Sequence, residues 1–350
     1  MRTGWIIGVV LIGVLLGCSQ AARPLPPAPT TDAGTDDPPK RDKFGEDRLP
    51  KAADVKTYPI DGDRVVKYVK QLCDLGPRVS GSDGMAKQQK LLTKHFEDLG
   101  GKVTRQDFRA TQRSRAAAPV AMCNLVVSFF PDRKKRIIFC SHYDTRPSAH
   151  EETDRNNWNR PFLSANDGTG GAAMLMELAH HLKDFPTGVG VDLVLFDGEE
   201  YIFEMAIPYV KEGDKYFFGS EHFAAEFKKA KAAGTKDYAA AILLDLCQAE
   251  GARLAIEGHS WASAPQLVTE LWRVAAQQGA KSFKWEQGYQ RSFYVTDDHI
   301  ALNEVGIPAV DVLDFDYPHW HKLTDTPDKI SPKQCVEVGT VLLAWLQLQK

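Results

Sequence analysis

The sequence lacks an excess of charge of either sign, since 43 Lys and Arg side chains stand against 46 Asp and Glu side chains and give a formal net charge of -3. Without a basic surplus there is no strong field to hold a phosphate backbone, which argues against a nucleic-acid-binding protein. With 43% apolar and 25% charged residues, the composition is that of a globular chain with a large core. It specifies no oligomeric state.

Cysteine is scarce and never occurs in a CxxC spacing, so the sequence predicts no thiolate metal site. Apart from Cys18, the cysteines are Cys73, Cys123, Cys140, Cys247 and Cys335. An oxidising compartment would permit one or two disulfides among them, but an odd set cannot be paired from sequence. Buried free thiols fit the pattern equally well.

The apolar segment near the start of the chain is too short for a membrane span, which needs about 20 residues. It extends from Trp5 to Leu16, follows a single arginine and ends just before Cys18. This pattern predicts a signal peptide over residues 1–18. Residues 15–18 resemble a bacterial lipobox, so we expect export, a lipid on Cys18, and anchoring to the cell envelope on its periplasmic or outer-surface side.

Residues 19–51 are rich in proline and almost free of large apolar residues, which predicts a disordered tether. Residues 52–350 contain no second linker and no repeat, so we expect one folded domain there.

Within this domain, short apolar runs alternate with amphipathic helices, which is typical of an α/β fold. The runs at 137–139, 193–196 and 242–244 are apolar at consecutive positions, as strands covered on both faces require. We therefore predict a single-domain, three-layer α/β/α architecture with a mixed, mostly parallel central sheet. The expected strands are 124–130, 136–140, 191–196, 240–246, 253–256 and 309–313, and the expected helices are 63–73, 84–99, 171–182, 220–233, 264–278 and 332–348.

Polar side chains follow several of the predicted strands, at the edge of a parallel sheet where ligand sites form. They are His142, Asp144, the run 197–200 and Asp245, to which Asp167 at a glycine-rich helix start and His321 after the last strand are added. Two adjacent carboxylates, Glu199 and Glu200, follow the carboxyl end of a buried strand. Burying two such charges without a bound cation would cost several kcal/mol of free energy. One carboxylate can bind a metal while the other carries protons, so the sequence predicts a catalytic metal site.

The sequence contains an ordered series of short motifs. They are LGPRVSGS at 75–82, SHYD at 141–144, NDGTGGAAMLMELA at 166–179, LVLFDGEE at 193–200, FGSEHF at 218–223, LLDL at 243–246, TDDH at 296–299 and HWHKLTDTPD at 319–328. Their order resembles that of the co-catalytic zinc aminopeptidases and of their relatives, the animal-type glutaminyl cyclases. The resemblance covers about residues 55–350.

This resemblance implies that Asp167, Glu200 and His321 bind zinc and that Glu199 is the general acid/base. In the aminopeptidases, the positions that match His142 and Asp245 bind a second zinc, with Asp167 bridging, whereas the cyclases hold one. The resemblance thus implies one zinc ion or two. It also suggests a cis peptide between Asp167 and Gly168.

Three features favour the cyclase, which would convert the N-terminal Gln of a peptide or protein to pyroglutamate and release ammonia. They are the doubled aspartate in Asp297-Asp298-His299, Trp320 directly before His321, and FGSEHF. By the same resemblance Asp297 and Asp245 would form a network that stabilises the leaving ammonia, and Trp320 an apolar wall of the pocket. The alternative is a zinc aminopeptidase, in which Glu199 activates water; a non-catalytic binding module of this fold is a third reading.

The sequence departs from the vertebrate cyclase pattern around the substrate pocket. Residues 201–217 replace a loop that carries a second pocket tryptophan, and they contain none. Asp311 stands where that pattern has a histidine, and Ser141 and Ala172 stand where it has a disulfide.

Overall fold

The computed structural model describes residues 58–115, 118–203, 213–287 and 294–350. The expected signal peptide, Cys18 and the tether lie outside these residues. Within them, no helix combines the length and the apolar character that a membrane span requires.

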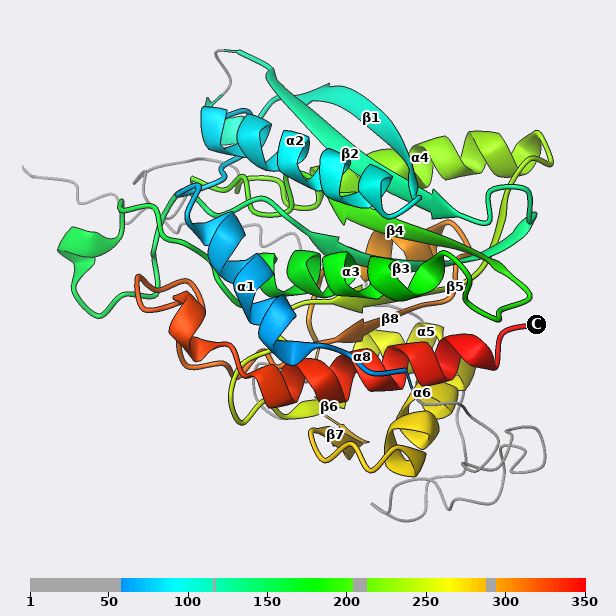
Figure 1. Cartoon of the computed structure of the whole chain (residues 1–350). Coiled ribbons are helices and arrows are strands. Elements are labelled where there is room, and N and C mark those ends of the chain that lie inside the picture. Colours follow the sequence, from blue (N-terminus) through cyan, green and yellow to red (C-terminus); the bar gives the residue numbers. More distant parts are fainter. Residues whose placement is uncertain (1–57, 116–117, 204–212, 288–293) are drawn as a thin grey trace, which may run out of the picture. The chain divides into compact units, whose positions relative to one another are not determined.

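A six-stranded sheet forms the centre of the domain, in the order β1-β2-β4-β3-β5-β8 (Figure 1). Strand β2 pairs antiparallel with both β1 and β4, and the remaining neighbours pair in parallel. The predicted mixed, mostly parallel sheet is therefore confirmed. Its strands are β1 (Lys102–Ala110), β2 (Val120–Phe129), β3 (Lys135–His142), β4 (Gly190–Phe196), β5 (Asp237–Leu244) and β8 (Ala309–Val312).

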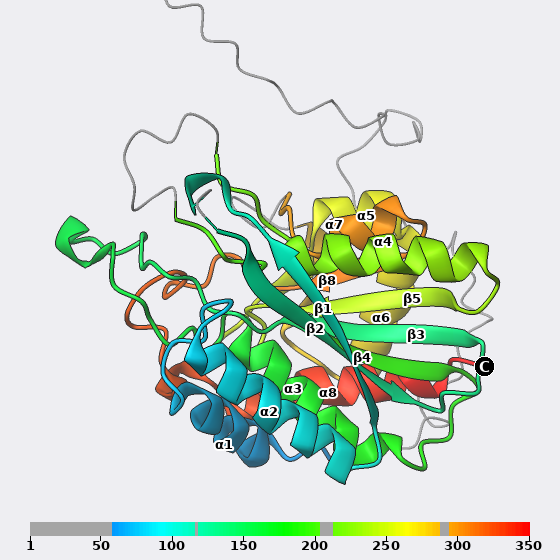
Figure 2. The ribbon, with the colours of Figure 1, turned by 90° about the horizontal axis from the view of Figure 1, so that it is seen from above.

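Helices cover both faces of this sheet, as Figure 2 shows. One face is covered by α1 (Gly62–Cys73), α2 (Asp83–Asp98), α3 (Thr169–Leu182) and α8 (Pro332–Gln347), and the other by α4 (Phe218–Ala232), α5 (Gly258–Ser263) and α7 (His299–Glu304). Alternate residues of β3 lie in two separate hydrophobic cores, one on each face of the sheet. Ile137 and Phe139 belong to one core, and Ile138 and Cys140 belong to the other. These strands are buried on both faces, as their unbroken apolar runs predicted.

The run expected as a strand at 253–256 does form one, but it lies outside the central sheet. Strand β6 (Leu254–Ile256) pairs in parallel with β7 (Phe283–Gln287) in a separate two-stranded sheet. Helix α6 (Pro265–Gln277) packs against β7 and α8. The described cysteines, Cys73, Cys123, Cys140, Cys247 and Cys335, are all buried free thiols.

Helix α3 lies unusually close to the ends of β3 and β5. A Cβ atom at Gly171 would overlap Ser141 Oγ and the backbone carbonyl oxygen of Leu244. Only glycine permits this approach, which brings the residues before α3 to the carboxyl edge of the sheet.

Candidate metal centre

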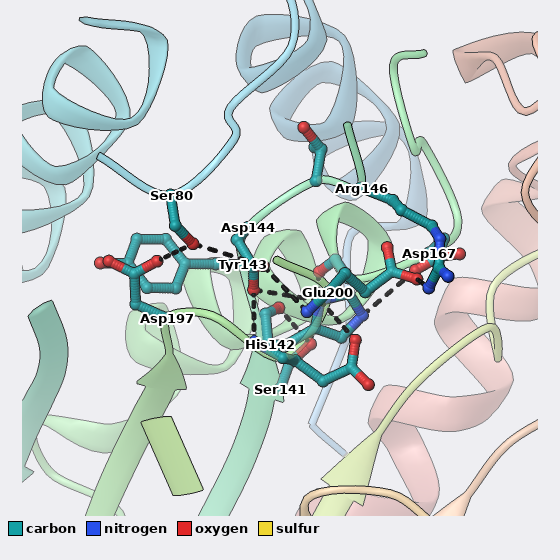
Figure 3. A network of polar contacts seen from close by, with 12 residues as sticks. Ser80, Ser141, His142, Tyr143, Asp144, Arg146, Asp167, Asp197 and Glu200 are labelled. Atoms are coloured by element: carbon teal, nitrogen blue, oxygen red, sulfur yellow. Dashed lines mark hydrogen bonds and ion pairs between the residues drawn. The ribbon is translucent and has the colours of Figure 1, made fainter. Parts of the chain in front are cut away.

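The polar residues predicted after the strands converge at one edge of the sheet. His142 ends β3, Glu199 and Glu200 follow β4, and Asp245 follows β5 directly. Asp167 precedes α3, and Figure 3 shows its carboxylate near Glu200 and His142. This convergence follows from the parallel pairing of β3 with β4 and β5, which places their carboxyl ends together.

Asp167, Glu200 and His321 form a buried group whose ligand atoms all lie within 4.8 Å of one another. Glu200 Oε1 pairs with His321 Nε2, and Asp167 Oδ2 lies 3.4 Å from the same nitrogen. Glu200 Oε2 and Asp167 Oδ2 are buried without a hydrogen-bond donor. Two carboxylates and one imidazole facing a common point are a donor set that suits zinc with an open position. The group therefore fits the predicted metal.

Electrostatics separate the two carboxylates of this group. Burial raises the pKa of Asp167, and the charge of Glu200 raises it further. Burial acts on Glu200 in the same sense, but His321 and Arg146 outweigh it and hold the pKa of Glu200 below its usual range. Anions this deeply buried require compensation, which a divalent cation would supply.

His142 joins this group to a second one. Its Nε2 atom lies 3.2 Å from Asp167 Oδ1 and 3.4 Å from Asp245 Oδ1. Burial alone would lower the pKa of His142, but bonds with Asp144, Asp167 and Asp245 outweigh it and raise the pKa. The ligand atoms of His142, Asp167 and Asp245 also lie within 4.8 Å of one another. The structure thus brings together the residues expected around a second metal.

Glu199 lies beside these groups without belonging to the first. Its Oε2 atom is 3.9 Å from His142 Nδ1, and the residue is 9% exposed. Burial raises the pKa of Glu199 well above its usual range, despite the opposing charge of His142. A carboxyl group with a raised pKa binds a proton more readily than an exposed one, which suits an acid/base residue.

Asp297 and Asp298 are buried and lie close enough to Glu199 for their charges to act on it. Burial raises the pKa of Asp297, and the charge of Asp245 raises it further. The pKa of Glu199 is raised in turn by Asp297 and Asp298. Asp297 and Asp245 are therefore close enough for the charge of Asp245 to act on Asp297, as the predicted network of these two residues requires. Asp311 adjoins Asp297, and the pKa of Asp311 is raised by burial and then by Asp297.

Trp320 lies against the imidazole of His321. The two ring centroids are 3.9 Å apart with the planes at 27°, and Phe315 packs edge-on to the indole at 4.8 Å. Trp320 is half-buried, which is the position that an apolar wall beside the metal would take.

The peptide between Asp167 and Gly168 is trans, so the cis peptide suggested by the resemblance is not found. Gly168 instead has a φ of 66°, and a Cβ atom there would overlap the imidazole of His142. Glycine at this position thus serves a left-handed turn and a close approach.

Sequence reasoning gave no role to three buried residues around the centre. Asp144 accepts hydrogen bonds from the backbone amides of Glu199 at 3.1 Å and Glu200 at 3.0 Å (Figure 3). Arg146 lies 3.5 Å from Glu200 Oε1, and Asp325 binds the backbone of Asp167 at 3.3 Å. Asp144 and Asp325 lie inside the motifs SHYD and HWHKLTDTPD, which were the available signal, whereas Arg146 lies two residues beyond SHYD. A motif does not show which backbone or side chain a residue contacts.

A three-layer α/β fold with a buried carboxylate and imidazole centre at the carboxyl edge of its sheet defines a metal-dependent enzyme of the exopeptidase type. The chain belongs to peptidase family M28, whose model matches residues 124–346. The resemblance stated from the motifs is thereby confirmed.

Among solved structures, the chain is similar to a glutaminyl cyclase from Fimbriiglobus ruber, with 64% identity, a TM-score of 0.82, and coverage of 86% of this chain and 100% of that one. It is similar to a leucine aminopeptidase precursor from Bacteroides thetaiotaomicron VPI-5482 at 30% identity, with a TM-score of 0.75 and coverage of 85% and 100%. A glutaminyl cyclase from Bacteroides thetaiotaomicron, bound to N-acetylhistamine, is 29% identical, with a TM-score of 0.76 and coverage of 84% and 100%.

Proposed function

We propose that this protein is a zinc-dependent glutaminyl cyclase, which converts the N-terminal Gln of peptides or proteins to pyroglutamate and releases ammonia. The observation that carries this assignment is the 64% identity to the Fimbriiglobus ruber glutaminyl cyclase over the whole of that chain. The cluster of carboxyl groups around Glu199 supports it, because the reaction must move protons from an amine to a leaving ammonia.

Asp167, Glu200 and His321 would hold one zinc ion. When bound, zinc supplies a Lewis acid that polarises the side-chain amide carbonyl of the substrate. Asp167 Oδ1 and Asp245 Oδ1 already have His142 Nε2 as a partner, at 3.2 and 3.4 Å. His142, Asp167 and Asp245 are a second group whose ligand atoms lie within 4.8 Å of one another, so metal analysis of the purified protein decides between one zinc ion and two.

Glu199 would carry the proton through the reaction. It takes a proton from the α-amine of the N-terminal Gln as the amine nitrogen bonds to the side-chain amide carbon. It then gives a proton to the departing nitrogen as the old carbon–nitrogen bond breaks, so that ammonia leaves. Asp245 and Asp297 would form a hydrogen-bonded network that stabilises that ammonia, while Trp320 forms an apolar wall beside the substrate.

An aminopeptidase remains the competing function, because the same zinc ligands and Glu199 could activate water. The specific observation in its favour is the 30% identity to the leucine aminopeptidase precursor. The two reactions differ only in the attacking group, so substrate and product decide between them.

The test is to incubate the purified protein with a Gln-initiated peptide and, separately, with leucine anilide, each with and without a chelator. Ammonia release together with a pyroglutamyl product, both abolished by the chelator, is the expected result. Cleavage of leucine anilide without any pyroglutamyl product would reject the cyclase in favour of the aminopeptidase.

We also propose that residues 1–18 are a lipoprotein signal peptide, that a lipid on Cys18 holds the protein at the bacterial cell envelope, and that residues 19–51 tether the catalytic domain, residues 52–350. The lipobox-like sequence before Cys18 and the proline-rich composition after it support this arrangement. Peptide N-termini outside the cytoplasm would then be the substrates.

A further inference from the structure

Asp325 lies in the loop that carries His321, and its buried side chain reaches the loop that carries Asp167. Its Oδ1 atom accepts hydrogen bonds from the backbone amide of Asn166 at 3.0 Å and from the hydroxyl of Tyr317 at 2.8 Å. Its Oδ2 atom accepts one from the backbone amide of Asp167 at 3.3 Å. The amide of Ala165 also donates to the backbone carbonyl of Asp325 at 3.4 Å. One residue therefore joins the loops of two candidate zinc ligands.

His321 needs such support because its backbone is strained. Its φ is 52°, a left-handed conformation that residues other than glycine rarely adopt and that persists only where surrounding contacts impose it. Tyr317 precedes His321 and Asp325 follows it, so the hydrogen bond from the Tyr317 hydroxyl to Asp325 closes the turn that contains His321. The amide of Leu323 donates to Glu152 Oε1 at 2.8 Å and fixes the same turn from outside.

The loop before α3 is also held from its other side. Arg78 is fully buried and donates to the carbonyl of Leu163 at 2.8 Å and to Thr169 Oγ1. Two charged groups therefore hold the backbone before α3. The Arg78 guanidinium binds the carbonyl oxygen of Leu163, and the Asp325 carboxylate binds the amides of Asn166 and Asp167. Asp144 holds the amides of Glu199 and Glu200 in the same manner.

We propose that Asp325 is a positioning residue, which sets Asp167 and His321 at the separation that zinc requires before the ion binds. This inference rests on the proposed function in one respect, that these two residues bind the metal. In Asp325→Asn an NH2 group that cannot accept replaces one carboxylate oxygen, so the amide of Asn166 or that of Asp167 loses its acceptor and the turn of His321 can relax. The ion would then have to order both loops as it binds, and zinc affinity would fall.

The experiment compares the full-length variants Asp325→Asn and Tyr317→Phe with the wild type. Zinc release to a chromophoric chelator gives the dissociation constant and rate without any substrate. We expect Asp325→Asn to bind zinc about 10–100-fold more weakly, the usual effect of losing an outer contact to a metal ligand. Tyr317→Phe, which removes one donor, should weaken binding less. With zinc in excess, the kcat of Asp325→Asn should return toward the wild-type value with KM little changed.

Asp328→Asn is the matched control, because Asp328 lies three residues after Asp325, is exposed, and pairs with the half-buried Lys329 at 2.6 Å. It should bind zinc as the wild type does. A folded Asp325→Asn variant with unchanged zinc affinity would overturn the inference, even if its melting temperature fell. If Asp325→Asn did not fold, unchanged zinc release from Tyr317→Phe would overturn it equally. A wild type that bound no zinc would instead refute the metal assignment and the proposed function with it.

Discussion

Glu199 and Glu200 are neighbours in the chain, but their environments shift their pKa values in opposite directions. Burial raises the pKa of Glu199, and nearby carboxylates add to that effect. Burial would also raise the pKa of Glu200, but pairing with His321 and the charge of Arg146 hold it low. One residue is therefore suited to carry protons and the other to remain an anionic ligand, which is a division of roles found in many active sites.

Replacing Glu199 with Gln should reduce kcat on a Gln-initiated peptide by about 10²–10⁴-fold, the range for loss of a general acid/base. Zinc content should not change, since Glu199 is not among Asp167, Glu200 and His321. Steady-state kinetics and metal analysis of the same preparation check both parts. Glu221→Gln, at an exposed position of α4, should match the wild type. An unchanged rate in Glu199→Gln would remove this residue from the mechanism.

At the scale of elements, α1 is fixed to α3 by a carboxylate that takes no part in the metal centre. Glu177 of α3 has a fully buried carboxylate, which accepts hydrogen bonds from Arg64 Nε at 2.6 Å and from the backbone amide of Asp61 at 3.0 Å. Burial alone would raise the pKa of Glu177, but bonds from His181 and Arg64 outweigh it and lower the pKa to about 2.

Because this pKa is depressed on folding, the bonds of Glu177 stabilise the protein fully above the ordinary value of 4.5, and the contribution disappears as pH falls toward about 2. Glu177→Gln should therefore lower the free energy of unfolding at pH 7 by about 2 kcal/mol, after allowance for the half-exposed Arg64. The difference from the wild type should shrink as the pH falls below 4.5. Denaturant titrations at a series of pH values measure it.

The control for this prediction is Glu97→Gln, at an exposed position of α2, which should change stability by less than about 0.5 kcal/mol at any pH. A constant difference between Glu177→Gln and the wild type across the acid range would contradict the linkage. It would mean that packing, rather than charge, holds α1 against α3.

At the scale of the whole molecule, we propose that the N-terminal region directs export and that residues 52–350, which contain every candidate site residue, are the catalytic domain. If Cys18 carries a lipid, Cys18→Ala should move the protein from the membrane fraction to the soluble fraction of the cell envelope or the medium. Activity on a Gln-initiated peptide should persist, because the active site does not involve this residue.

Fractionation of cells followed by immunodetection, with mass analysis of the N-terminus, measures this change. Thr30→Ala, a substitution within the expected tether, should leave the protein with the membranes. If the Cys18→Ala protein stayed in the membrane fraction, the anchor would have to lie elsewhere, and the lipobox interpretation would be wrong.

The sequence alone determined the fold class, because buried parallel strands need consecutive apolar residues and surface helices need a periodic apolar face. Residues 137–139 and 193–196 carried that signal, whereas β1 did not, since its residues are mostly exposed or half-buried. The ordered motifs also determined which residues gather at the metal centre, because parallel strands necessarily bring their carboxyl ends together.

Only the tertiary structure decided what holds those residues in place. The hydrogen bonds that the amides of Glu199 and Glu200 donate to Asp144, and the one that the amide of Asp167 donates to Asp325, join segments that are far apart in the chain. Likewise, the opposite pKa shifts of Glu199 and Glu200 depend on which charges lie across the site. A hydrogen bond or a charge pair acts over a few ångströms in space, and sequence patterns record only separation along the chain.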